Sequence, residues 1–124
     1  MLGLRTIGYL VEDLQKAKLW YAKAFKTQPY FDEPYYVGFN IGGYELGLLP
    51  NEHPEMVKSD NILGYWGVDD IQKEYQLLLE LGAKEHEAPH SVGDPLMVAS
   101  VRDPWNNVIG LIYNPAFKLP LKAL

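Results

Sequence analysis

The chain has 124 residues, of which 48% are hydrophobic and 22% are charged, the composition of an ordinary soluble globular protein of about one domain. Its formal net charge of −5 argues against nucleic-acid binding, which needs clustered lysine and arginine, and the absence of cysteine excludes disulfides, thiolate metal ligands and cysteine nucleophiles. Because neither a secretion signal nor an apolar run approaching the roughly 18 residues that span a bilayer is recognisable, we expect a cytoplasmic protein without a membrane partner.

The first half of the chain predicts a strand, a helix and a β-hairpin. These elements fall at residues 4–11 (strand), 14–26 (helix), 35–41 and 44–49 (strands). Asp13 is placed to cap the helix, and Gly42-Gly43 predicts a tight turn between the last two strands. Residues 50–60 are rich in proline, asparagine, serine and charge, so we interpret them as a linker.

The second half predicts the same order of elements. They fall at residues 62–68 (strand), 71–81 (helix), 96–102 and 108–113 (strands). Asp69 or Asp70 caps the helix and Gly82 ends it. Residues 85–95, with proline, histidine and glycine, are expected to be a loop, and residues 103–107 a turn in which asparagine takes the left-handed conformation.

Two pairs of matching phrases indicate an internal repeat. Val11-Glu12-Asp13-Leu14 matches Val68-Asp69-Asp70-Ile71, and Leu46-Gly47-Leu48-Leu49 matches Ile109-Gly110-Leu111-Ile112. Two unrelated strand-helix starts are the alternative explanation. We predict an α+β fold: a single domain of two βαβββ modules at about 4–50 and 61–115, with helices outside a cup-shaped sheet and a C-terminal tail over 116–124.

The motifs resemble those of one known superfamily. The pattern V-x-D-[LI] after a first strand, the aromatic pair Trp20-Tyr21 in the helix, and Val92-Gly93-Asp94 followed by residues 98–111 are similar to features of the vicinal oxygen chelate superfamily, including its "DPxGNxxGL" ending. Glyoxalase I, extradiol dioxygenases, fosfomycin resistance proteins and bleomycin-binding proteins belong to it. The resemblance covers about residues 4–115 and implies the cup-shaped fold more specifically than any activity.

The resemblance also implies where a metal would be bound. Enzymes of the superfamily hold one divalent metal through a residue on the first strand of each module and a carboxylate on a last strand, where it can polarise a substrate oxygen. The matching positions here are Thr6, Leu63, Gly47 and Gly110. Leucine and glycine side chains offer no donor and threonine is a poor one, so we expect no metal and no cofactor.

Strand alternation predicts which side chains line the cup, because residues two apart share a face. Val37, Phe39 and Ile41 are expected to face a helix, which turns the residues between them inward. The candidate ligand-binding residues are Thr6, Tyr36, Asn40, Leu63, Tyr65, Ser100 and Arg102. Mixed aromatic, small and polar linings are typical of small-molecule pockets. The alternative is that Tyr36, Tyr65 and Leu63 fill the cup as core.

Three kinds of titratable residue are candidates for chemistry. Glu45 on the inner face could be a catalytic general base, or an exposed carboxylate near the rim. Arg102 could hold an anionic group, or be solvated beside Asp103. The histidines, His53, His86 and His90, are interpreted as surface residues in loops, because the proline before the last of them does not fit a helical zinc motif.

We therefore predict a metal-free protein that binds a small organic molecule in the cup. The alternatives are a lyase, isomerase or dioxygenase of the same superfamily with a displaced active site, with or without a divalent metal, and a structural protein whose cup is filled. A homodimer is expected, with partly exposed aromatic residues at its interface. The candidates for this interface are Trp20, Tyr21, Tyr35 and Trp105.

Overall fold

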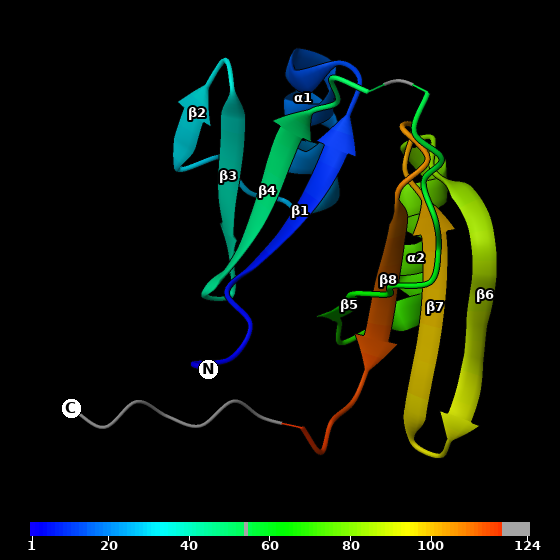
Figure 1. Cartoon of the computed structure of the whole chain (residues 1–124). Helices are drawn as coiled ribbons and strands as arrows, with labels where there is room; N and C mark the ends of the chain where they lie inside the picture. The colour runs from blue at the N-terminus through cyan, green and yellow to red at the C-terminus, as the bar shows by residue number, and fades with distance from the viewer. Residues whose placement is uncertain (54, 118–124) are drawn as a thin grey trace. The chain divides into compact units, whose positions relative to one another are not determined.

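The computed structural model describes residues 1–53 and 55–117, and most of the expected tail over 116–124 lies outside them. Two βαβββ modules are present, which confirms the predicted α+β fold class (Figure 1). The first comprises β1 (Thr6–Val11), α1 (Leu14–Ala24), β2 (Phe31–Glu33), β3 (Tyr36–Ile41) and β4 (Tyr44–Pro50). The second comprises β5 (Tyr65–Gly67), α2 (Ile71–Glu80), β6 (Lys84–Gly93), β7 (Leu96–Arg102) and β8 (Val108–Tyr113).

Two compact units contain these modules. The first unit consists of Met1–Asn61 together with Pro104–Asn107, and the second of Ile62–Asp103 together with the segment that starts at Val108. The turn between β7 and β8 therefore belongs to the first unit, although both strands belong to the second.

The two sheets have the same topology. In the first sheet the strand order is β1-β4-β3-β2, with β1 parallel to β4 and the other neighbours antiparallel. In the second sheet the order is β5-β8-β7-β6, and β5 is parallel to β8. The repeated sequence phrases thus correspond to repeated structural positions: each lies at the end of a first strand or within a last strand.

Helix α1 begins where the sequence predicts. The Asp13 carboxylate accepts a hydrogen bond from the backbone N–H of Lys16 at 3.1 Å, which satisfies one of the free donors of the first turn. The buried positions Leu14, Ala17, Tyr21 and Ala24 follow helical spacing and pack the helix on β3 and β4. This burial makes α1 the cover of one sheet face.

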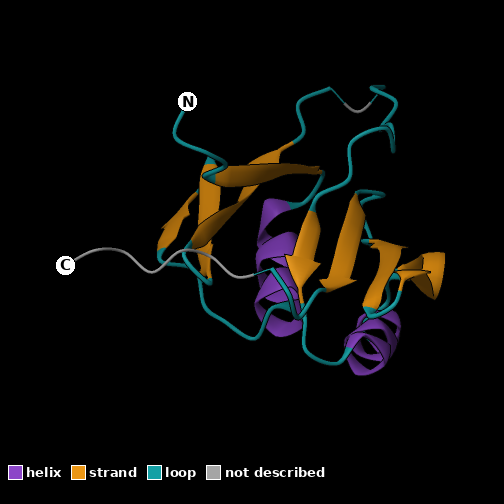
Figure 2. Cartoon of the chain, turned by 90° about the horizontal axis from the view of Figure 1, so that it is seen from below, coloured by secondary structure: helices purple, strands orange, loops and turns teal. Residues whose placement is uncertain are grey.

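Helix α2 repeats this design in the second unit. Asp70, rather than Asp69, accepts from the backbone N–H of Lys73 at 3.1 Å. The helix ends at Glu80, Leu81 is its C-cap, and the next residue, Gly82, has a φ of +102°, as a helix C-terminus favours. Each helix packs on its own sheet, and Figure 2 distinguishes the helices from the strands.

The core of the first sheet confirms the predicted alternation. Val37 and Phe39 of β3 and Leu46 and Leu48 of β4 are fully buried on the helix side. The residues between them therefore lie on the opposite face. The tight turns are also confirmed, with φ of +60° at Gly42 and +69° at Asn106.

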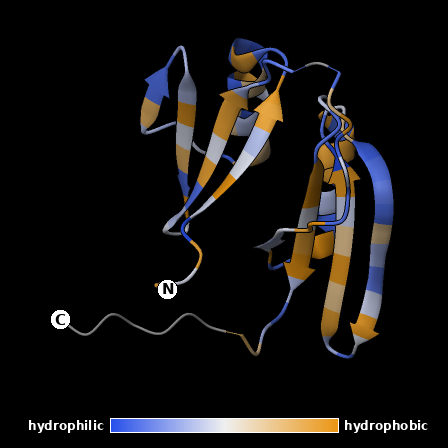
Figure 3. Ribbon diagram, viewed as in Figure 1, coloured by the Kyte–Doolittle hydropathy of each residue, from blue (hydrophilic) through white to orange (hydrophobic). Residues whose placement is uncertain are grey.

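Two strands were not expected from the sequence. Residues 85–95 were predicted as a loop, but β6 covers most of them, and β2 was missed entirely. Both are edge strands with mostly exposed residues, and β6 is interrupted by register shifts, so neither has the alternating pattern of a half-buried strand. Figure 3 shows the contrast between the hydrophilic β6 and the hydrophobic β7 beside it. The expected strand over 62–68 is shorter, since β5 begins only at Tyr65. Neither described helix has the length and apolarity needed to cross a membrane.

Candidate functional site

A row of glycines crosses the face of the first sheet that lies opposite α1, which we call the first open face. Gly8 of β1 pairs with Gly47 of β4, and Gly47 pairs with Gly38 of β3. Residues paired in this way point to the same side of a sheet, so the three form one row. Without Cβ atoms, this row leaves space in which larger side chains from the neighbouring rows can lie.

Two tyrosine rings occupy that space. A Cβ atom at Gly47 would lie 2.7 Å from Cζ of Tyr36, closer than real Cβ contacts come. A Cβ atom at Gly38 would lie 3.3 Å from both Cε1 of Tyr30 and Cε2 of Tyr36. The glycine row therefore allows the rings of Tyr30 and Tyr36 to lie close to the backbone.

The two tyrosines hold the carboxylate of Glu45. The hydroxyl of Tyr30 donates to Oε1 of Glu45, and the hydroxyl of Tyr36 donates to Oε2 at 2.5 Å. Burial raises the pKa of Tyr36, so its hydroxyl stays protonated as a donor at neutral pH. The predicted base is thus half-buried on the predicted face, with both oxygens accepting hydrogen bonds, and forms a positioned negative charge.

Two other predicted residues flank Glu45. Thr6 of β1 and Asn40 of β3 are its register partners on either side. The Asn40 side chain accepts from the backbone N–H of Gly43 at 2.8 Å and so also stabilises the turn before β4. The structure therefore brings four predicted site residues, including Tyr36, onto one face.

Tyr30 is a site residue that sequence reasoning missed. It precedes the three-residue strand β2, and its backbone N–H donates to the carbonyl of Gly38 at 3.0 Å. That bond places Tyr30 beside β3 and within reach of Glu45. An aromatic residue directly after Pro29 was the available signal, but without β2 nothing in the sequence places it near β4.

The second sheet contains a similar glycine and tyrosine pair on the face opposite α2, the second open face. Gly110 of β8 pairs with Tyr65 of β5 and with Ser100 of β7. A Cβ atom at Gly110 would lie 2.6 Å from the carbonyl oxygen of Gly64 and 2.8 Å from Cδ1 of Tyr65. The ring of Tyr65 thus lies over Gly110, as the ring of Tyr36 lies over Gly47.

A histidine contacts the buried serine of this face. Nδ1 of His86 lies 2.7 Å from Oγ of Ser100, which is 3% exposed. A register shift between Glu85 and Glu87 in β6 places His86 there, as β-bulges re-aim side chains. The prediction that His86 and His90 lie in loops was wrong, because both belong to β6.

The remaining predicted residues also belong to the second unit. Arg102 is half-buried and pairs with Lys84 and Val108, while Leu63 lies before β5 and is 38% exposed. The predicted site residues are therefore divided between the two units. Thr6, Tyr36, Asn40 and Glu45 belong to the first unit, and Leu63, Tyr65, Ser100 and Arg102 to the second.

The side chains at the four expected metal-ligand positions do not fit a divalent metal. Gly47 and Gly110 have no donor, and tyrosine rings fill the space beside them. Leu63 also has no donor, which leaves the hydroxyl of Thr6. Within residues 1–53 and 55–117, no three histidine, aspartate or glutamate side chains are arranged to hold a metal ion.

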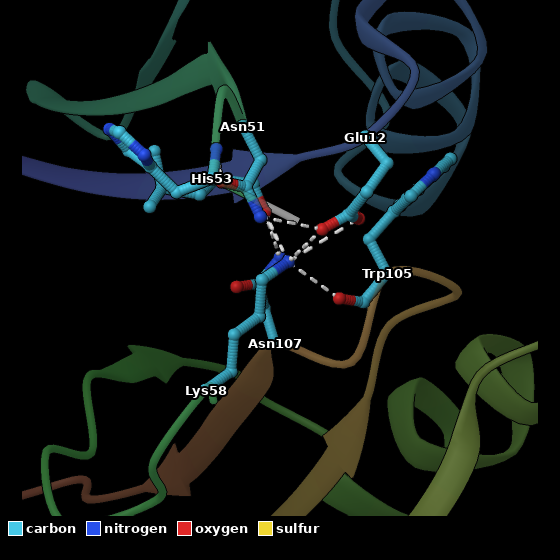
Figure 4. Close-up of polar contacts among 7 residues, drawn as sticks. Glu12, Asn51, His53, Lys58, Trp105 and Asn107 are labelled. Atoms are coloured by element: carbon cyan, nitrogen blue, oxygen red, sulfur yellow. Dashed lines mark hydrogen bonds and ion pairs between the residues drawn. The ribbon is translucent and has the colours of Figure 1, made fainter. Parts of the chain in front are cut away.

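A polar cluster lies at the end of β1, within the first unit (Figure 4). Lys58 Nζ donates to the carbonyl oxygens of Leu10 at 2.6 Å and Trp105 at 2.7 Å, and lies 3.0 Å from Oε1 of Glu12. The Asn107 amide donates to the same Leu10 carbonyl at 2.9 Å. We call these five residues the Lys58 cluster.

The Lys58 cluster covers the free edge of β1. In the parallel pair with β4, the carbonyls of Arg5 and Val11 accept hydrogen bonds from the backbone N–H groups of Glu45 and Asn51. Successive carbonyls along a strand point to opposite sides, so the carbonyl of Leu10 points away from β4. Lys58 and Asn107 satisfy it. Asn107 is part of the "DPxGNxxGL"-like segment, which therefore has a structural role here.

Glu12 is the charged partner in the Lys58 cluster. Burial opposes its ionisation, but hydrogen bonds from Asn51 and Lys58 and the charge of Lys58 outweigh this and lower the pKa of Glu12. A cavity of about 410 Å³ lies beside the cluster. Its lining residues are Glu12, Met56, Val57, Lys58, Pro104, Trp105 and Asn106.

Solved structures share this fold. A glyoxalase-related enzyme from Fulvimarina pelagi is 16% identical with a TM-score of 0.78, covering 97% of this chain and 94% of its own. A fosfomycin resistance protein from Listeria monocytogenes is 14% identical with a TM-score of 0.77, covering 94% and 96%. A lactoylglutathione lyase from Agrobacterium tumefaciens is 17% identical with a TM-score of 0.71, covering 94% and 98%. At these identities the likeness shows the fold alone.

Family membership rests on a sequence model. A comparison with curated proteins gives no match. The model of the Glyoxalase/Bleomycin resistance protein/Dioxygenase superfamily, however, matches residues 3–111, which is most of the chain and includes both repeats. The sequence phrases, the two βαβββ modules and this match agree, and the chain belongs to the Glyoxalase/Bleomycin resistance protein/Dioxygenase superfamily.

Proposed function

We propose that the chain binds a small organic molecule without a metal, as a homodimer in the cytoplasm. One observation carries this proposal: tyrosine rings occupy the space beside Gly47 and Gly110, the positions at which the superfamily resemblance implies a carboxylate ligand. A ring over a glycine offers a flat apolar surface with a polar end, which suits an organic ligand better than an ion.

The first open face is the proposed binding surface. Its aromatic rings supply apolar area, and its polar groups fix the orientation of a ligand, the usual division of roles in small-molecule sites. The proposed ligand-binding residues on this face are Thr6, Tyr36, Asn40 and Glu45, joined by Tyr30. On the second open face they are Leu63, Tyr65, Ser100 and Arg102.

The metal part of the proposal is tested by elemental mass spectrometry. Untagged protein is analysed as purified and after incubation with Zn²⁺, Ni²⁺, Mn²⁺ and Fe²⁺ followed by desalting. We expect far less than one equivalent of every metal, because the donor positions hold glycine and leucine. One equivalent of a single metal, retained after desalting, would overturn the proposal.

The ligand part is tested by a fragment screen followed by NMR with the full chain. We expect saturable binders that shift the backbone amides of Gly38 and Gly47 and lose affinity in Tyr36→Ala. The matched control, Tyr44→Ala, removes a half-buried ring of β4 that directly precedes Glu45 and therefore lies on the opposite face of the sheet. A screen without any saturable binder at the open faces would contradict the proposal.

An enzyme of the superfamily with a displaced site is the second candidate. The observation in its favour is the Tyr30-Glu45-Tyr36 group, in which two phenol hydroxyls donate hydrogen bonds to one carboxylate. To act as a general base, one oxygen of Glu45 would have to give up its hydrogen bond from a tyrosine hydroxyl and accept a proton from a substrate within hydrogen-bond distance. Turnover of a screened binder, abolished in Glu45→Gln, would establish this candidate, and a rate unchanged in Glu45→Gln would exclude Glu45 as the base.

A further inference from the structure

The charged strand residues of the first open face are all negative. Its strand residues are Thr6, Gly8 and Leu10; Glu45, Gly47 and Leu49; Tyr36, Gly38 and Asn40; and Phe31 and Glu33. Two of these residues are glutamates, and none is lysine, arginine or histidine. The nearby ion pair of Lys18 with Asp32, at 2.9 Å, belongs to the helix side, because Asp32 alternates with Phe31 and Glu33.

Three groups converge above Gly38. The position that a Cβ atom would take at Gly38 lies 3.3 Å from a ring carbon of Tyr30, 3.3 Å from a ring carbon of Tyr36 and 3.4 Å from Oε1 of Glu45. The two rings and the carboxylate fill this point, so a ligand lying on the exposed side of the rings would contact aromatic surface beside a carboxylate. This combination favours positive charge, which aromatic rings and carboxylates both attract.

The aromatic surface continues to the edge of the sheet. The Phe31 ring centroid lies 6.1 Å from that of Tyr36 and 6.2 Å from that of Tyr35, both in edge-to-face geometry. Tyr30 is 64% exposed and Tyr35 is 65% exposed, so these rings are not core residues of the unit. An extended exposed aromatic surface can stack on a planar ligand.

We propose that the first open face binds a planar aromatic cation, with Glu45 as its counter-ion and the rings of Tyr30 and Tyr36 as its stacking surface. This inference rests on the proposed small-molecule function and names its ligand class. An anionic ligand would meet two glutamates without a balancing cation. A neutral ligand would gain no charge attraction from Glu45, which the tyrosines hold beside the aromatic surface.

Three matched probes test the ligand class: N-methylquinolinium as the cation, quinoline as the neutral analogue and 2-naphthoate as the anion. Dissociation constants are measured at pH 7.5 from backbone amide shifts of the full chain. We expect the cation to bind about tenfold more tightly than quinoline, with the largest shifts at Gly38, Glu45 and Gly47. We expect 2-naphthoate to bind weakest.

Two variants distinguish the effect of the Glu45 charge on cation binding from the effect of the net charge of the protein. Glu45→Gln keeps the size and an acceptor oxygen, and should weaken the cation about tenfold while leaving quinoline unchanged. Glu80→Gln, which removes an exposed carboxylate at the end of α2, is the matched control and should change neither. Equal weakening of the cation by both variants would show general charge attraction and overturn the inference.

The outcomes distinguish this inference from the proposed function. If quinoline or 2-naphthoate binds the first open face as tightly as the cation, the ligand class is wrong while the binding function stands. If none of the three probes shifts the amides of this face and the fragment screen also gives no binder there, both are wrong. The comparison of probes uses the unmodified protein, so it remains valid even if Glu45→Gln fails to fold.

Discussion

At Gly47 and Gly110, neighbouring atoms leave too little room for a side chain. The two positions differ in which atoms an added methyl group would contact. At Gly47 the nearest atoms are those of the Tyr36 ring, which belongs to a half-buried side chain that can move. At Gly110 a Cβ atom would lie 2.6 Å from the carbonyl oxygen of Gly64, which is backbone and is already bonded to the Gly110 N–H. The same substitution should therefore have unequal costs.

We predict that Gly47→Ala lowers the free energy of unfolding by about 1 kcal/mol and Gly110→Ala by about 3 kcal/mol, since overpacking costs increase when the neighbour cannot yield. Urea unfolding of both variants measures this. Gly67→Ala is the control, because no atom lies within 4 Å of the added methyl group, and it should be nearly neutral. The Gly47→Ala cost should also fall in a Tyr36→Leu background, as coupled neighbours are non-additive. Equal costs at the two glycines would refute this account.

The pH dependence of stability should reflect Glu12. The pKa of Glu12 is lower in the folded chain than its ordinary value. Ionised Glu12 therefore stabilises the fold at any pH above that ordinary pKa. This stabilisation is lost as the pH falls through the pKa of the folded chain. We predict that Glu12→Gln is less stable than the unmodified chain at pH 7 and that the difference disappears in acid, below the folded pKa of Glu12. Urea unfolding at several pH values measures it. A difference that persisted in acid would show that the charge of Glu12 is not the cause.

How well the candidate site could be predicted also depends on single residues. Alternation alone placed Tyr36, Asn40 and Glu45 on one face, because β3 and β4 have regular patterns with buried residues on the other side. Tyr30 could not be placed, since its position depends on β2 and on a backbone bond to Gly38. His86 could not be placed either, because its contact with Ser100 depends on an irregular register in β6.

Among the elements, the helices and the strands with apolar patterns could be predicted, whereas the polar edge strands β2 and β6 could not. The helices have capping aspartates and apolar stripes, and β7 and β8 have continuous apolar runs that only burial explains. An edge strand such as β6 needs few apolar residues and tolerates Pro89, because one of its sides forms no ladder. Its sequence therefore resembles that of a loop.

The free edge of β1 gives a prediction at this scale. The Lys58 side chain is 12% exposed and donates to two backbone carbonyls; in Lys58→Met the Trp105 carbonyl loses this donor and the Leu10 carbonyl keeps the one from Asn107. We predict a loss of about 1–3 kcal/mol in the free energy of unfolding at pH 7, measured with urea, because two part-buried acceptors would lose a charged donor. Lys16→Met, which removes an exposed lysine from α1, is the control and should change stability little. A loss no larger than that of the control would mean that water replaces Lys58 without cost.

For the whole molecule, the repeat predicted two modules of the same topology, and the structure has them. The sequence did not reveal that a segment from the second half of the chain belongs to the first unit. Pro104–Asn107 belong to the first unit, and the Asn107 amide reaches Leu10 across 97 positions of sequence. Local patterns contain no information on contacts at such separations.

The assembly of the whole molecule remains a prediction. Tyr35 is exposed and Trp20 and Trp105 are half-buried, whereas Tyr21 is fully buried and contributes to the core rather than to an interface. We expect sedimentation equilibrium at micromolar concentration to give about twice the single-chain mass of 14.1 kDa. A Tyr35→Ser variant should shift the equilibrium toward single chains, and a mass near 14.1 kDa for the unmodified protein would refute the dimer.

The assignment of Pro104–Asn107 to the first unit has a consequence for synthesis on the ribosome. Residues 1–61 are made before residues 104–107, so the Asn107 donor and the Trp105 carbonyl that complete their unit emerge only after both β7 and the turn that follows it have been translated. Until then the Leu10 carbonyl and the Lys58 ammonium lack these partners. Closing so long a loop adds only a modest entropic cost once β7 and β8 have formed. Residues 1–61 are therefore made before most of the second unit, while their own unit can be completed only after residue 107 has been made.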